Sequence, residues 1–465
     1  MFNKEIYIQR RDKLMKSVGS GIILLYGNAD VPYNYADNTY HFRQDSTFRY
    51  FFGLDVPLMV GILDVDNHEE YLFADDVDIN DIIWTGPMPS VKDMAESAGI
   101  YKTGSYEEAG KFLKNAQTSD RQIHYIKPYR SFMLVQLHHM LGLSISEISE
   151  HASHKLVMAI IKLRSKKEPV EIAELDKAFE IGYLMHTAAQ QLCKPGQKEQ
   201  YIAGVMEGIA KSYGIGLSFP TILTQHGEVL HNHKPNHILE SGKLMLVDAG
   251  AENNEGYCSD HTRTSPVSGK FTQRQKEVYQ IVVDAHDYAL TVAKPGNTWK
   301  QVHLDACKVI AQGLKNLGLM KGNIEDAVAE GAHALFMPHG LGHMMGLDVH
   351  DMENLGQQFV GYDDEIRPSS QFGLSSLRMG RRLEEGFVIT DEPGIYFIPD
   401  LIDLWKSQGL HTDFLNYEAI EKYKDFGGIR IEDDVIITAE GSRFCGDKVI
   451  PYHVDELEEY LANRQ

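Results

Sequence analysis

The sequence predicts two domains that mix helices and strands, an α/β domain followed by a larger α+β domain. Three observations support this. The chain has 465 residues, more than one domain usually contains. Its first third alternates short strand-like runs with helical patterns. A charged break, Ser165–Pro169 (SKKEP), separates two long helical stretches. We therefore place the domains at residues 1–163 and 164–465.

The first domain is expected to begin with a helix over residues 3–18. The apolar strand 21–26 follows, with further β-type runs at 48–53, 60–65 and 70–73. Short β runs separated by helices are typical of an α/β unit. This half gathers no metal-binding or nucleophilic residues, so its default role is substrate gating or oligomerisation.

In the second domain, helical patterns come first and β patterns follow. Pro169 falls in the first turn of a helix, where its missing N–H costs nothing. The helical patterns cover residues 145–163, 168–192 and about 198–213. The main β runs cover residues 243–250, 257–264, 387–394 and 428–437.

Composition excludes several classes of function. The net charge of −21, with 66 acidic against 45 basic residues, argues against nucleic acid as a partner, because phosphate binding needs a basic surface. The four cysteines are scattered, which fits reduced thiols. The start of the chain lacks an apolar signal region, and no run is long enough to span a membrane. We expect a soluble cytoplasmic protein without a membrane partner.

The stretch 338–351 contains three histidines, His339, His343 and His350, among several glycines. Each glycine disfavours a helix by about 1 kcal/mol relative to alanine. In an extended chain, His339 and His343 would point into the same space because alternate side chains share a face. A single histidine would more often belong to the core, but three in twelve residues predict a functional site.

Carboxylates stand at the ends of three β runs. Asp248 ends one apolar run, and Asp260 lies in the next, so a hairpin would set them opposite each other. Facing carboxylates repel unless a cation lies between them. Glu392 ends a third run, because Pro393 cannot continue a strand. Any one of these acids alone is more often a turn or cap residue.

Arg430, Glu432 and Asp434 alternate along the last β run and so share a face. Taken alone, this is more often an exposed salt-bridged stripe. Together with the other acids it completes an oxygen-rich set that suits two divalent cations and hydrolase chemistry. The candidate ligands are Asp248, Asp260, His343, Glu392 and Glu432.

Five motifs occur in a characteristic order: VDAG (247–250), DHTRT (260–264), HGLGH…DVHD (339–351), EPG (392–394) and RIEDD (430–434). This ordered set resembles the pita-bread dimetal peptidases, above all aminopeptidase P and prolidase, which cleave the bond preceding proline. Residues 164–465 resemble the catalytic domain, a curved antiparallel sheet covered by helices. The first half resembles the creatinase-like N-terminal domain, notably at YHFRQDS (40–46).

The resemblance implies a division of roles among the ligands. Asp260 and Glu432 would bridge two metal ions, Asp248 would complete one, and His343 and Glu392 would complete the other. Mn²⁺ is the metal expected from the resemblance, although carboxylate-rich sites also accept Co, Zn or Fe. Glu392 would in addition carry a proton during catalysis.

Other residues gain a role only through the resemblance. His231, His339 and His350 would hold the scissile carbonyl oxygen. Arg430 would orient the glutamate beside it, and Tyr396 would support the site, although a strand tyrosine is more often packing.

The chain departs from the family pattern in three places. The interval from Asp248 to Asp260 is twelve residues, one more than expected, which requires the strand register to be restored. Asn232 stands where a tyrosine is usual, and Asp391 where an aliphatic residue is usual. Asp391 would face away from the metals and be neutral for catalysis.

The two halves favour different substrates. Trp84, in a segment that resembles aminopeptidase P, would line the substrate pocket of an oligomer or else pack locally. Arg378 lies where prolidases hold the carboxylate of a dipeptide, a role that suits a guanidinium, or it is an ordinary basic loop residue. We favour an Xaa-Pro aminopeptidase, because that resemblance spans more residues, with an Xaa-Pro dipeptidase as the alternative.

Two other classes are disfavoured. A non-enzymatic protein of this fold would have lost ligands, and none is lost. A methionine aminopeptidase would not have this N-terminal domain or this spacing from His343. The expected partners are proline-containing peptides and further copies of the chain, in a homodimer or homotetramer.

Overall fold

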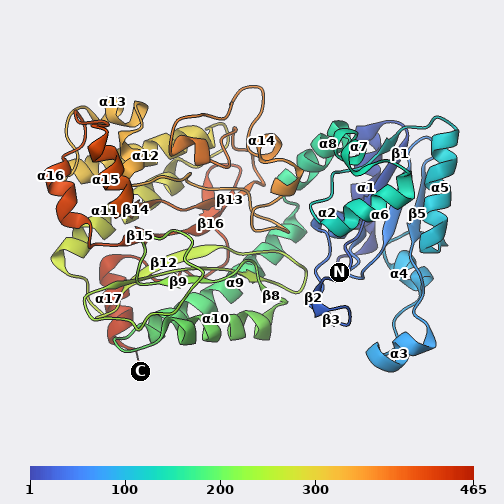
Figure 1. Ribbon diagram of the computed structural model, residues 1–465, viewed down its shortest axis with the longest axis horizontal. Coiled ribbons are helices and arrows are strands. Elements are labelled where there is room, and N and C mark those ends of the chain that lie inside the picture. Colours follow the sequence, from blue (N-terminus) through green and yellow to red (C-terminus); the bar gives the residue numbers. More distant parts are fainter. Residues whose placement is uncertain (465) are drawn as a thin grey trace. The chain divides into compact units, whose positions relative to one another are not determined.

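The computed structural model describes residues 1–464 and divides into two compact units (Figure 1). The first unit comprises residues 1–164, and the second begins at Ser165. Among the described residues, no helix is both long enough and apolar enough to cross a membrane.

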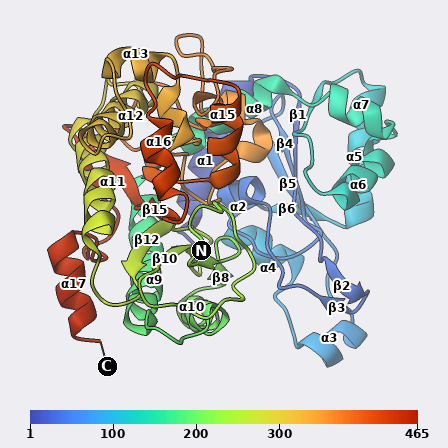
Figure 2. The ribbon, with the colours of Figure 1, turned by 60° about the vertical axis from the view of Figure 1, so that its left-hand side comes forward.

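A five-stranded mixed sheet forms the core of the first unit, in the order β6-β5-β4-β1-β7. The strands are β1 (Ile22–Tyr26), β4 (Val60–Asp64), β5 (Glu69–Phe73), β6 (Lys102–Gly104) and β7 (Ile123–His124). Helices α1 (Lys4–Val18) and α2 (Ser46–Phe52) lie on one side of the sheet, and α5 (Tyr106–Thr118) and α6 (Ser131–Leu141) on the other (Figure 2). The predicted mixture of helices and short strands is confirmed.

The aromatic run 48–53, predicted as β, is helical and forms most of α2. The side chain of Asp45 accepts a hydrogen bond from the N–H of Phe48 at 2.9 Å, which caps the start of the helix. Gly53, at φ 68°, ends it in the left-handed conformation. These two local caps decide in favour of a helix despite the high β propensity of the aromatic residues.

The single helix predicted over 145–163 is two helices, α7 (Ile145–Glu150) and α8 (His154–Ser165). Ser153 separates them because its N–H donates to the carbonyl oxygen of Tyr125 at 2.8 Å. Its hydroxyl then accepts the N–H of Leu156 and begins α8. The break therefore depends on a contact with a distant residue, which periodicity does not show.

The second unit is built from antiparallel strand pairs. The strands are β8 (Gly216–Leu217), β9 (Ile222–Thr224), β10 (Leu244–Ala249), β11 (Ala251–Glu252), β12 (His261–Pro266), β13 (Val388–Asp391), β14 (Gly394–Tyr396), β15 (Gly428–Arg430), β16 (Asp433–Ile437) and β17 (Ser442–Phe444). They form the sheets β12-β10-β9 and β13-β16-β17 and two smaller pairs, β11-β8 and β14-β15. A backbone bridge between Thr262, in the edge strand β12, and Glu432, just before β16, links the two larger sheets.

Long helices cover these sheets. Helix α9 (Pro169–Leu192) packs on β10, β11 and β12, and α10 (Glu199–Tyr213) packs beside it (Figure 1). Helix α11 (Gln273–Val292) lies against β13–β15 and β17 and pairs with α12 (Trp299–Asn316). Shorter helices are α3 (Ile79–Thr85) and α4 (Val91–Ser97) in the first unit and α13 (Ile324–Ala329), α14 (Gln357–Val360), α15 (Pro399–Ser407), α16 (Tyr417–Ile420) and α17 (Val454–Ala462) in the second.

The predicted hairpin is present, but its register differs from the expected one. Asp248 pairs with Thr262, two residues beyond Asp260. The β10–β12 ladder runs from Leu244 to Ala249 without a shift, so the twelve-residue interval is accommodated outside it, in the connection that contains β11. No bulge is needed within the ladder.

The last predicted β run, 428–437, is interrupted at Ile431–Glu432, between β15 and β16. This break places Glu432 beside β12, where its N–H donates to the carbonyl oxygen of Thr262 at 3.0 Å. A strand end, rather than a continuous strand face, therefore presents this acid.

Two close contacts fix the histidine-rich stretch to the rest of the second unit. A Cβ at Gly342 would lie 1.9 Å from the carbonyl oxygen of Thr390, so only glycine allows this approach. Lys167, just before α9, forms a 3.1 Å ion pair with Asp351, and both side chains are 1% exposed. The ion pair ties the stretch to the start of the second unit.

Asp351→Asn leaves the Lys167 ammonium buried without its counter-charge and should lower the free energy of unfolding by about 3–5 kcal/mol. Urea unfolding of the full chain measures this. Glu384→Gln is the matched control, because its partner, Lys166, is exposed, and the change should stay below about 1 kcal/mol. Equal effects of the two substitutions would contradict the importance of the buried pair.

Candidate active site

Every predicted site residue of the second unit lines one cavity of about 500 Å³. These residues are His231, Asp248, Asp260, His339, His343, His350, Arg378, Glu392, Arg430 and Glu432. Trp84 belongs to α3 of the first unit and is 86% exposed, so its alternative role in local packing is wrong.

Strand ends from both larger sheets bring the candidate ligands together. Asp248 lies in β10, Asp260 precedes β12, and Glu432 lies between β15 and β16. The ligand atoms of Asp260, His343 and Glu432 all lie within 4.8 Å of one another. The Nε2 atom of His343 is 3.5 Å from Asp260 Oδ2 and 4.0 Å from Glu392 Oε1.

The orientation of His343 suits a metal ligand. Its Nδ1–H donates to the carbonyl oxygen of Met344 at 3.2 Å, which leaves the Nε2 lone pair facing the carboxylates. Burial holds the pKa of His343 well below its usual value, so the ring is neutral. The ring of His350 stacks on it, with centroids 3.7 Å apart.

The buried carboxylates repel one another. Burial and the neighbouring Glu432 raise the pKa of Asp260 well above its usual value. Burial and the neighbouring Glu392 do the same to the pKa of Glu432, and burial raises the pKa of Glu392 to about 8. One oxygen of Asp260 and one of Asp248 are buried without a hydrogen-bond partner. Such a group of acids is stable in its ionised form only around a cation.

Arg430 organises one side of the cavity. Its guanidinium donates to Asp248 Oδ2 at 2.6 Å, to the hydroxyl of Tyr396 at 2.8 Å and to that of Thr262 at 3.0 Å. Thr262 in turn donates to Glu432 Oε2 at 2.6 Å. That Arg430 orients the glutamate beside it stays a prediction. The Nε atom of Arg430 lies 3.9 Å from Glu432 Oε2 and also reaches that acid through Thr262, while the shortest bond of the guanidinium goes to Asp248.

The predicted carbonyl-binding histidines differ in their surroundings. The Nδ1–H of His339 donates to the carbonyl oxygen of Gly340 at 2.8 Å, and its Nε2 accepts the hydroxyl proton of Tyr396 at 2.9 Å. Burial lowers the pKa of His339 to about 3, so this ring is neutral. His231 makes no hydrogen bond to the described residues, which leaves its ring available to a ligand in the cavity.

A short chain of contacts connects His350 with Arg378. Glu353 Oε1 accepts the Nδ1–H of His350 at 3.0 Å, and Glu353 Oε2 accepts a hydrogen bond from Arg378 Nη1 at 2.8 Å. The side chain of Arg378 remains 47% exposed. Arg378 therefore lines the cavity and is held there by Glu353.

Comparison with known proteins places this geometry in a family. The model described as metallopeptidase family M24 matches residues 173–439, and that described as aminopeptidase P, N-terminal domain, matches residues 7–124. The chain belongs to metallopeptidase family M24. The resemblance found from the sequence and the predicted fold, an N-terminal domain followed by a pita-bread catalytic domain, are confirmed.

M24 relatives of both expected activities match nearly the whole chain. The Xaa-Pro dipeptidase of Homo sapiens is 30% identical over 99% of this chain and 92% of its own length. The Xaa-Pro aminopeptidase of Escherichia coli is also 30% identical, over 98% of each chain. A structure of a variant E. coli aminopeptidase P in complex with substrate has a TM-score of 0.80 and 28% identity, covering 99% of this chain and 98% of that one.

As an M24 member, the protein is a metal-dependent peptidase of a family with dinuclear divalent metal centres. The cavity fits such a centre. It offers carboxylate oxygens without hydrogen-bond partners and an unprotonated imidazole nitrogen aimed at them.

Sequence reasoning assigned no role to several residues that support the cavity. Thr262 and Thr390 hold Glu432 and the backbone N–H of His343, but strand threonines carry no sequence pattern that separates them from ordinary β residues. Glu353 follows His350 by three residues in a polar stretch, a spacing that could have indicated the contact. Asp391 does not line the cavity; it is buried, and burial raises its pKa to about 7.

Asp260→Ala should abolish binding of Mn²⁺ in the cavity, because Asp260 faces both His343 and Glu432. His339→Ala should retain metal and lose activity. Metal content after gel filtration in Mn²⁺ measures the first effect and peptide hydrolysis the second. Equal metal loss in both variants would refute the division of roles.

The metal-free protein should become less stable as the pH rises. The pKa of Glu392 is raised from 4.5 to about 8, so between these values the folded state keeps a proton that the unfolded state releases. Thermal unfolding in chelator at about pH 6 and about pH 8 tests this, with a lower midpoint expected at the higher pH.

Saturating Mn²⁺ should remove this loss, since the cation replaces the protons. Glu392→Gln should reduce it, because an amide does not ionise. A metal-free wild type that is more stable at the higher pH would contradict the repulsion among the carboxylates.

Proposed function

We propose that the protein is an Xaa-Pro aminopeptidase, which removes the N-terminal residue from peptides with proline in second position. The observation that carries this proposal is the convergence of five metal-binding side chains in one cavity of an M24 peptidase. The match of residues 7–124 to a model described as aminopeptidase P, N-terminal domain, is consistent with this proposal, although the Xaa-Pro dipeptidase of Homo sapiens also matches 99% of the chain.

We infer that Asp248, Asp260, His343, Glu392 and Glu432 would hold two divalent ions, with Mn²⁺ as the expected metal. The ions, when bound, polarise the scissile carbonyl and lower the pKa of water.

We infer that Glu392 carries a proton from the attacking water to the proline nitrogen as the peptide bond breaks, because its carboxyl group lines the cavity, 4.0 Å from Nε2 of His343. His231 is the histidine free to donate a hydrogen bond to the carbonyl oxygen as charge develops there. We infer that His339 acts mainly through Tyr396 and Gly340, which occupy both its ring nitrogens.

A second candidate activity is Xaa-Pro dipeptidase. Arg378 lies on the cavity wall, and one Nη donor is engaged by Glu353. The remaining donors of its guanidinium fit the free carboxylate of a dipeptide. A longer peptide has no charge at that position, so the two activities make different demands on this residue.

The exposed Trp84 supports a proposal about assembly. A tryptophan that is 86% exposed is unusual on a monomer and is typical of an interface. We propose a homodimer or homotetramer in which Trp84 helps to line the substrate pocket, in a cytoplasmic protein whose partners are proline-containing peptides.

Substrate length separates the two activities. The Mn²⁺-loaded protein should release the N-terminal amino acid from Arg-Pro-Pro as well as from Ala-Pro at matched concentrations. Arg378→Ala should raise KM for the dipeptide. It should leave KM for the tripeptide unchanged, because a tripeptide has no free carboxylate at that position. Arg382→Ala is the matched control, since Arg382 pairs with Glu365 on the surface.

Hydrolysis of Ala-Pro alone would establish the dipeptidase. Hydrolysis of neither peptide by protein with bound metal would refute the Xaa-Pro assignment.

A further inference from the structure

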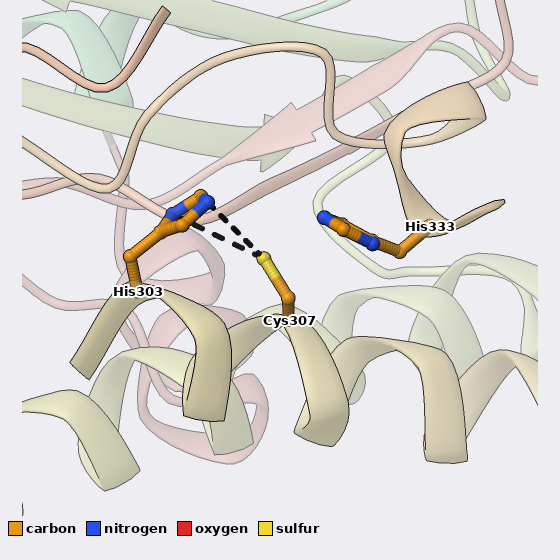
Figure 3. Close-up of side chains that lie close together, drawn as sticks. All are labelled: His303, Cys307 and His333. Carbon is orange, nitrogen blue, oxygen red and sulfur yellow. Dashed lines mark hydrogen bonds between the residues drawn. The ribbon is translucent and has the colours of Figure 1, made fainter. Parts of the chain in front are cut away.

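A second cluster of metal-binding side chains lies outside the catalytic cavity. His303 and Cys307 are one turn apart on α12, and His333 belongs to a short 3₁₀ segment, Ala332–Leu335. The three side chains point toward one another (Figure 3). Their ligand atoms all lie within 4.8 Å of one another, and none of the three residues is more than 1% exposed.

The hydrogen-bonding potential of this cluster is not satisfied. Both ring nitrogens of His333 are buried without a partner. The ring of His303 has only the sulfur of Cys307 nearby, at 3.6 Å from Nε2 and 3.9 Å from Nδ1. A buried polar group without a partner costs about 1–3 kcal/mol, so the imidazole of His333 requires an explanation, and that of His303 has only a weak thiol as its partner.

The geometry matches nitrogen–sulfur coordination. Ligands at about 2.1 and 2.3 Å from a tetrahedral ion are themselves about 3.6 Å apart. The sulfur of Cys307 and Nε2 of His303 have this separation. The ligand atoms of His333 lie within 4.8 Å of those of His303 and Cys307, so a metal at the centre would draw His333 inward.

The protonation states are compatible with this role. Burial lowers the pKa of His303 to about 3 and that of His333 to about 4, so both rings are neutral and have a lone pair to donate. Burial raises the pKa of the Cys307 thiol, so its proton leaves only when a cation takes its place.

We propose that His303, Cys307 and His333 form a binding site for a thiophilic metal ion, Zn²⁺ or Cu⁺, separate from the catalytic centre. On binding, the metal–sulfur bond replaces the S–H bond of Cys307, and the proton goes to solvent. No oxidation or reduction is involved.

The ligand set separates this site from the catalytic one. Thiolate and imidazole select zinc and monovalent copper, whereas carboxylates select harder ions such as Mn²⁺. With one thiolate and two neutral rings, Cu⁺ leaves the buried site neutral and Zn²⁺ leaves one positive charge. Burial therefore favours Cu⁺, because a neutral site is easier to bury. Both ions share a filled d shell and bind nitrogen and sulfur ligands.

The place of the cluster gives the ion a structural role. The carbonyl oxygen of His333 accepts the N–H groups of Phe336 and Met337, and this segment continues to His339 in the catalytic cavity. A metal would thus join α12 to the segment that leads into the active site. Binding to the folded state alone stabilises it by mass action.

Metal–sulfur spectroscopy on the full-length protein tests the proposal. The catalytic centre is first filled with Mn²⁺, and the protein is then titrated anaerobically with Co²⁺ as a zinc probe, with Zn²⁺, or with Cu⁺ against a chelating competitor. A sulfur-to-cobalt charge-transfer band and a metal–sulfur distance of about 2.3 Å by X-ray absorption are expected, with about one equivalent bound.

Cys307→Ala should abolish the metal–sulfur bond. Cys193→Ala is the matched control, because Cys193 is equally buried and lies outside the cluster, and it should retain the bond. His333→Phe provides a second variant that keeps the thiol and should lower metal affinity by at least about tenfold. Bound metal should raise the midpoint of thermal unfolding in the wild type and not in Cys307→Ala.

The titration arms distinguish the two ions, and binding of either supports the site. Absence of any metal–sulfur bond in the wild type with all three ions would overturn the proposal. Persistence of that bond in Cys307→Ala would overturn it as well, because another cysteine would then be the ligand.

Discussion

Mutual repulsion of buried carboxylates is the constraint on which the second unit depends. Asp260, Glu392 and Glu432 all have raised pKa values because burial and neighbouring acids oppose their ionisation. Antiparallel pairs hold the backbone rigidly enough to keep these acids together. Among the described residues, Arg430 is the one guanidinium that bonds to the side chain of a candidate ligand, and it offsets only part of the negative charge. The divalent ions of the family supply the remainder.

Uncharged side chains connect the charged groups around the cavity. Thr262 and Tyr396 pass hydrogen bonds from Arg430 to Glu432 and His339, so the orientation of the acids and of the histidine is coupled. This coupling explains why side chains that never carry charge belong to the functional unit. The histidines of the cavity also differ in their ability to bind a ligand. Both ring nitrogens of His339 are already hydrogen-bonded, whereas those of His231 remain available.

Two histidine environments in the second unit lead to different chemistry. In the cavity, the Nε2 atom of His343 faces carboxylates, which favour hard or borderline divalent ions. Around Cys307, the imidazoles face a thiol in a core without carboxylates in the cluster, which favours soft ions. One domain therefore offers two coordination chemistries that need not compete for the same metal.

The sequence by itself determined the family, the mixed fold and ten of the residues that line the cavity. The order of the five motifs carried this information. Their spacing along the chain restricts which acidic and histidine side chains can lie at the ends of the strands. Local patterns also gave most strands and long helices, but failed at 48–53 and at Ser153, where a cap or a distant carbonyl decided the outcome.

Only the tertiary structure decided the register that pairs Asp248 with Thr262, the bond from Arg430 to Asp248, and the contact of Glu353 with Arg378. It also brought His333 to Cys307, which no spacing predicted. The physical reason is the same in each case. These contacts join residues that are close only after the sheets and helices have packed, and hydrogen-bond geometry and burial then determine what each side chain does.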